Sequence, residues 1–186
     1  HDMRKACFSN HPYACDDAKS MEKTMNMEKN TAPANAKTAL ELLEKANQAL
    51  EENRIDGNTY HLFTKALSRD PTLSYAYLGR GIIAFMQNDK AGARADFTAA
   101  ILTDPDNVEA YYHRGIAYEE SESGVPDFQV ACRFGHTQAC RELRKLAELC
   151  EAAGIKNLRK KEFKKARDCF DRAIEIDMIY PDPYFN

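Results

Sequence analysis

Apolar residues recur every three to four positions through most of this chain, which is the spacing of amphipathic helices. The clearest stretch is residues 74–105, which predicts helices at about 73–87 and 91–103 joined by a turn at residues 88–92. Further helices are expected at about 12–28, 37–52, 58–69, 108–120 and 125–134. The pattern therefore indicates an all-α chain.

The same spacing repeats along the chain with a fixed period. Residues of the same type lie 34 positions apart in the pairs Phe63 and Phe97, Ala66 and Ala100, Tyr77 and Tyr111, and Gly81 and Gly115. A period of this length predicts an array of helix pairs, each burying its apolar face against its neighbours.

These residues resemble the tetratricopeptide repeat: an aromatic residue and Gly four apart, then Ala-x₃-Phe-x₂-Ala and Asp-Pro. The match is nearly complete in 74–107 and is three residues short at the turn in 108–136. It is partial in 40–73, where Asn47 and Thr59 replace small residues. The resemblance implies antiparallel helix pairs stacked into a right-handed superhelix, an α-solenoid.

The period also divides the chain into parts. Three repeats occupy 37–136, after the end of a preceding repeat, an extra helix and a linker in 1–36. Residues 137–186 are expected to hold an extra helix, a fourth repeat at 147–178 and the start of a fifth. Residues 137–160 contain more helix than one repeat needs, which leaves one long helix or an additional one open. Both ends look cut within repeats, as in a piece of a longer array.

Composition narrows the range of functions. The net charge of −3 argues against nucleic acid as the main partner. No apolar run approaches 18 residues, so we expect no membrane insertion. We find no nucleophile motif, no phosphate-binding loop and no zinc-protease motif. The sequence therefore predicts a protein that is not an enzyme and has no cofactor.

Two pairs of cysteines, Cys7/Cys15 and Cys132/Cys140, share the spacing C-x₇-C. Eight residues of straight helix span about 12 Å, whereas a disulfide needs Cα atoms within about 7 Å. A bridge therefore requires a chain reversal, which residues 10–12 and 135–137 can supply. Buried thiols in a cytoplasmic chain remain an alternative.

A metal site is a further alternative, since His11 and His136 lie midway between the paired cysteines. Each cluster offers only three ligands at a spacing unlike common zinc sites, so we expect no metal. A role in ending the turn is the simpler explanation for both histidines. Cys150 and Cys169 could form a third bond or fill the core between two helices.

The C-x₇-C segments resemble those of Sel1-like cysteine-rich secreted repeats, in which this spacing joins the end of one repeat to the start of the next. The resemblance implies disulfides Cys7–Cys15 and Cys132–Cys140. Disulfides would indicate a periplasmic or extracellular location, and thiols a cytoplasmic one.

The tetratricopeptide resemblance also implies a concave groove lined by the first helix of each pair. The residues expected in it are Tyr75, Leu78, Ile82, Phe85, Glu109, Tyr112, His113 and Ile116. Glu41, Glu44, Gln48, Glu148, Glu151 and Ile155 would flank them. An apolar, aromatic centre between acidic residues suits a peptide with basic flanks. The alternative is that the apolar residues pack on helices of the chain itself.

The predicted function is a non-catalytic scaffold that binds a protein or peptide partner. Two alternatives differ in class. One is a structural array that self-associates, and the other is a regulatory repeat domain of a larger enzyme.

Overall fold

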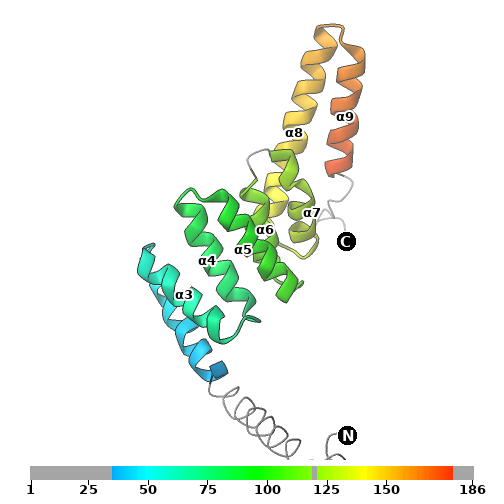
Figure 1. Cartoon of the computed structure of the whole chain (residues 1–186). Coiled ribbons are helices and arrows are strands. Elements are labelled where there is room, and N and C mark those ends of the chain that lie inside the picture. Colours follow the sequence, from blue (N-terminus) through cyan, green and yellow to red (C-terminus); the bar gives the residue numbers. More distant parts are fainter. Residues whose placement is uncertain (1–34, 119–120, 178–186) are drawn as a thin grey trace, which may run out of the picture.

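The computed structural model describes residues 35–118 and 121–177, and all regular structure in these residues is helical. A helix over residues 35–51 is followed by α3 (Gly57–Arg69), α4 (Ser74–Met86), α5 (Lys90–Thr103), α6 (Val108–Ile116), the 3₁₀ helix η1 (Ser121–Gly124), α7 (Val125–Arg133), α8 (Thr137–Arg159) and α9 (Phe163–Asp177). Successive helices pack as antiparallel pairs stacked along one direction (Figure 1). The fold is the all-α helical-repeat solenoid that the sequence predicts. None of these helices is long and apolar enough to cross a lipid bilayer.

Helix pairs are held together by a glycine packed against a phenylalanine ring. A Cβ atom added at Gly81 would lie 2.7 Å from the ring of Phe97, which is fully buried. Gly115 meets Phe128 at 2.6 Å and Gly154 meets Phe170 at 2.7 Å in the same way. Only a residue without a side chain lets the two helices approach this closely, so the spacing found in the sequence is a packing requirement.

An arginine–aspartate pair recurs in the two central helix pairs. Nε and Nη2 of Arg80 donate to Asp96 at 2.8 and 2.6 Å, and those of Arg114 donate to Asp127 at 2.8 and 2.7 Å. The arginines lie 34 positions apart but the aspartates only 31. The short turn therefore removes three residues between α6 and α7, where η1 lies, and leaves the packing on either side unchanged.

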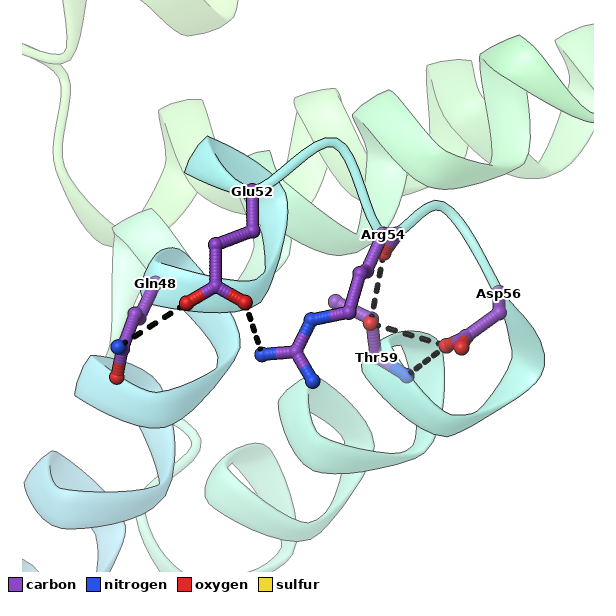
Figure 2. Close-up of polar contacts among 5 residues, drawn as sticks. All are labelled: Gln48, Glu52, Arg54, Asp56 and Thr59. Atoms are coloured by element: carbon purple, nitrogen blue, oxygen red, sulfur yellow. Dashed lines mark hydrogen bonds and ion pairs between the residues drawn. The ribbon is translucent and has the colours of Figure 1, made fainter.

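The first helix pair differs from the later ones, because Thr59 occupies a position where they have a small residue, Ala93, Gly124 or Ala166. The side chain of Thr59 is buried, and its hydroxyl oxygen lies 2.8 Å from the carbonyl oxygen of Arg54 and 3.0 Å from Asp56 Oδ1, so its one proton is shared between these two acceptors (Figure 2). Asp56 also accepts from the backbone N–H of Thr59 and thereby caps α3. Arg54 in turn pairs with Glu52 at 2.7 Å. The buried hydroxyl is thus satisfied within the turn.

Neighbouring pairs are joined by buried polar contacts. Asn107 caps α6 by accepting from the N–H of Ala110 at 3.1 Å, and its amide donates to Ser74 Oγ at 2.7 Å. Ser74 then donates to the carbonyl oxygen of Ala100 at 3.0 Å. One network therefore fixes the start of α4, the end of α5 and the start of α6.

Residues 137–159 form one continuous helix, α8, of 23 residues. The additional helix expected after residue 136 is therefore not separate but the first half of α8. Its first half contributes Leu143 to a core cluster with Phe128 of α7, and its second half packs through Gly154 on α9. The hairpin of α8 and α9 extends beyond the other pairs at one end of the molecule (Figure 1).

Replacing Phe97 with alanine should lower the free energy of unfolding by roughly 3–5 kcal/mol, because the ring is fully buried against Gly81. Thermal denaturation followed by circular dichroism measures the change. Phe163→Ala is the matched control, since that ring is 66% exposed and its loss should have little effect. A melting temperature only a degree or two lower for Phe97→Ala would contradict its place in the core.

Candidate functional site

The predicted groove residues lie on two successive first helices, α4 and α6. On α4, Tyr75 is 57% exposed, Ile82 and Phe85 are half-buried, and Leu78 is only 8% exposed. Leu78 belongs to the core cluster that contains Phe97, so it supports the helix and is not available to a ligand. Of the four α4 residues expected to face a ligand, only Tyr75, Ile82 and Phe85 are therefore accessible to one.

On α6, aromatic and acidic side chains form a contiguous cluster. The rings of Tyr112 and His136 stack with centroids 4.2 Å apart, and Tyr112 also meets the ring of His113 edge-on at 5.3 Å. His113 stacks in turn on Phe97 at 5.7 Å, which directs it toward the core. Glu109 is 54% exposed and lies 3.2 Å from Nε2 of His136. The structure thus brings Glu109, Tyr112 and His113 together with a histidine from the next turn.

His136 holds the start of α8 in place. Its Nδ1 accepts a hydrogen bond from the N–H of Ala139 at 3.1 Å, which leaves the ring proton on Nε2 to donate to Glu109. The sulfurs of its neighbours Cys132 and Cys140 lie 2.01 Å apart, at disulfide bonding distance. The histidine therefore ends the turn, and its nitrogens are engaged in holding the chain.

Other parts of the cysteine prediction have different outcomes. Cys150 and Cys169 are half-buried and do not form a disulfide with each other. Cys7, Cys15 and His11 lie outside the described residues. Within residues 35–118 and 121–177, no three His, Cys, Asp or Glu side chains are placed to hold a metal ion together.

A cavity of about 290 Å³ opens between α6, α7 and α8; we call it the α6–α8 pocket. Its lining residues are Tyr112, Gly115, Ile116, Tyr118, Phe128, Glu142 and Leu146. Tyr112 and Ile116 were expected to face a ligand, whereas Tyr118, Phe128, Glu142 and Leu146 were not. Glu142 and Leu146 are four residues apart on α8, and this helical spacing in the surplus stretch 137–152 is the signal that could have revealed them.

Two acidic and two basic side chains act on Tyr112 in the pocket. Burial, followed by the charges of Glu142 and Glu109, raises the pKa of Tyr112, and these effects exceed the lowering by Lys145 and Arg141. Further acidic and polar side chains expected beside the groove are exposed on their helices: Glu41, Glu44, Gln48, Glu148 and Glu151. The electrostatic environment favours a cationic group over an anionic one.

Comparison with solved structures supports the fold. The structure resembles that of YrrB, described as a TPR protein with an unusual peptide-binding site, with a TM-score of 0.51 and 21% identity over 86% of this chain and 93% of that chain. It also resembles MamA, with a TM-score of 0.52 and 18% identity over 85% and 93% of the two chains. No family model matches this sequence, and no curated protein sequence matches it significantly. The chain therefore has the tetratricopeptide-type fold.

The stability of the protein should fall as the pH drops below about 6.5 because of His113. Burial lowers the pKa of this histidine, an effect that His136 increases and Glu109 opposes. Below the ordinary value of 6.5, the unfolded chain takes up a proton that the folded chain does not, so the free energy of unfolding decreases. One such proton gives a slope of at most about 1.4 kcal/mol per pH unit.

Urea denaturation at pH 7.5 and pH 5.5 measures this dependence. His113→Phe should reduce the difference between the two pH values, whereas the same change at the exposed His61 should leave it as in the parent chain. An unaltered difference in the His113 variant would show that another group is responsible.

Removing the Cys132–Cys140 bond should lower stability by roughly 2–3 kcal/mol through the entropy of a short closed loop. The variant Cys132→Ser, compared with the parent chain by urea denaturation without reductant, tests this. Reductant should bring the parent chain to the same midpoint as the variant. Equal midpoints without reductant, with no mass difference of two hydrogens on reduction, would mean that the bond does not form in solution.

Proposed function

We propose that this protein is a non-catalytic scaffold that binds a peptide segment of a partner protein along the face formed by α4, α6 and α8. The observation that carries the proposal is the α6–α8 pocket, whose helix α6 is the first helix of the repeat that follows α4, where Tyr75 is exposed. Such a row of apolar positions with a side-chain-sized cavity suits an extended or helical peptide. The acidic side chains around it suit basic residues beside the apolar ones.

A location in an oxidising compartment, periplasmic or extracellular, is part of this proposal. It is supported by the close pair Cys132–Cys140, which joins the end of α7 to the start of α8 beside the pocket. Disulfides persist where thiols are not kept reduced. In that setting the turn that positions His136 would be held covalently.

Self-association is the second candidate, and one observation favours it. Exposed apolar side chains gather on the α8–α9 hairpin: Leu149 (65%), Ile155 (48%), Leu158 (44%) and Phe163 (66%). In a stacked array such residues would be covered by the next repeat. Light scattering over a concentration series distinguishes the two candidates, because a pure scaffold stays monomeric.

A random peptide library displayed on phage and selected on the intact chain tests the peptide proposal. Enriched peptides should combine an aromatic or aliphatic residue with a basic one. Tyr75→Ala and Tyr112→Ala should each weaken the best peptide by roughly 1–2 kcal/mol, about a tenfold change, as expected for aromatic contact residues.

Leu102→Ala is the control, because Leu102 is 79% exposed on α5, a second helix of its pair. Its affinity should match that of the parent chain, and circular dichroism confirms that each variant is folded. Peptides that bind all three variants equally would place the site on another face.

A further inference from the structure

Arginine side chains inside the fold lie against tyrosine rings and pair with a carboxylate, and the α6–α8 pocket offers groups of the same kinds. The guanidinium of Arg80 lies 5.8 Å from the ring centre of Tyr60 and 5.6 Å from that of Tyr77, while it pairs with Asp96. A guanidinium gains both from ring faces and from a two-pronged bond to a carboxylate. This combination of tyrosine rings and a carboxylate is therefore a complete site for an arginine side chain.

The third helix pair repeats the arrangement. The guanidinium of Arg114 lies 5.8 Å from the ring centre of Tyr111 and pairs with Asp127. Both arginines are held at a junction between helices, with only a fifth of each side chain exposed. The fold thus stabilises arginine in the same way in both central repeats.

The α6–α8 pocket contains the same kinds of group. Tyr112 and Phe128 supply rings from α6 and α7, and Glu142 supplies a carboxylate from α8. The ring of Tyr118 also lines the pocket, but the guanidinium of Arg94 already lies 5.6 Å from its centre. Glu142 pairs with Lys145 at 2.7 Å, but the lysine side chain is 63% exposed. An exposed ion pair of this kind is weak, worth about 0–1 kcal/mol, so an incoming cation can replace it.

We propose that the α6–α8 pocket is a subsite for one arginine side chain of the bound peptide, with Glu142 as the residue that pairs with the guanidinium. This deepens the proposed function and rests on it for its biological role. The volume of about 290 Å³ is at the lower limit of small-molecule sites, about 300–1,000 Å³, and so suits a single side chain. Ile116 and Leu146 would contact the aliphatic part of the arginine, as apolar surfaces do for long charged side chains.

The charges around the pocket support a cation over a neutral side chain. Burial raises the pKa of the Tyr112 hydroxyl, and beyond burial Glu142 and Glu109 raise it more than Lys145 and Arg141 lower it. An arginine whose charge lies between these groups would be attracted at close range, where the surrounding apolar side chains exclude part of the solvent. An aliphatic side chain would fill the same volume but would make no ion pair with the carboxylate of Glu142.

Binding of N-acetyl-arginine amide to the intact chain tests the subsite directly. The matched probe is N-acetyl-citrulline amide, which has nearly the same shape but no charge. Two-dimensional amide NMR spectra should show arginine-dependent shifts confined to the residues that line the α6–α8 pocket. The dissociation constant should be about tenfold lower for arginine than for citrulline, as expected for a charge-assisted hydrogen bond.

Glu142→Gln should abolish the difference between the two probes and leave the spectrum otherwise that of a folded chain. Glu175→Gln, an exposed carboxylate on α9 outside the pocket, should preserve it. Equal binding of both probes, shifts elsewhere, or stronger binding of N-acetyl-leucine amide at these amides would overturn the arginine subsite.

The two proposals fail separately. If library peptides bind the Tyr75 face without arginine, and the arginine amide does not bind, the scaffold function stands and the subsite does not. If the arginine amide binds but no library peptide does, the subsite stands and the peptide function is wrong.

Discussion

The contact between a glycine on the first helix of a pair and a phenylalanine on the second determines the rest of this structure. With Gly81 against Phe97, the two helices approach so closely that a single methyl group would collide with the ring. The same distance sets the position of the arginine–aspartate pair beside it and of the network that joins Ser74 to Asn107. Because the contact recurs in three helix pairs, each pair presents nearly the same surfaces to its neighbours. Successive pairs can therefore stack on one another in the same way.

Much of the fold was predictable because this contact leaves a periodic trace in the sequence. The period of 34 located the helix pairs, and the sequence also showed that three residues are missing after α6. The matched positions of Asp96 and Asp127 then showed that the turn between α6 and α7 is shortened while the arginine–aspartate contact is kept. The first pair was less predictable. Leu40 precedes Leu43 by three positions on the helix over residues 35–51, which is the spacing of one helix face, yet it is 54% exposed, while the neighbouring Ala39 is fully buried. A stripe with apolar residues on both sides does not fix the rotation of a helix to within one residue.

The site was predictable only in part, because its surfaces depend on how far apart the helices lie. The helical register placed Tyr75, Tyr112 and Ile116 on the outer side of their helices, where a ligand could reach them. The same register also selected Leu78 and His113, which both pack in the core around Phe97 of α5. The pocket could not be located from the repeat pattern, since Glu142 and Leu146 belong to the stretch of α8 that has no counterpart in the other repeats. Their position depends on the turn at His136, and this turn is held by a contact with Glu109, which lies 27 positions earlier in the chain.

The length of α8 has a mechanical consequence. At 1.5 Å per residue its 23 residues span about 34 Å, and the part near Leu143 is fixed in the core with α7. The tip of the hairpin, between Gly154 and Phe170, moves with the helix as a stiff arm. From Leu143 to Arg159 the arm is about 24 Å long, so a tilt of about 10° at the fixed end would displace the far end by about 4 Å. Small adjustments beside Tyr112 and His136 would therefore be amplified at a surface far from them.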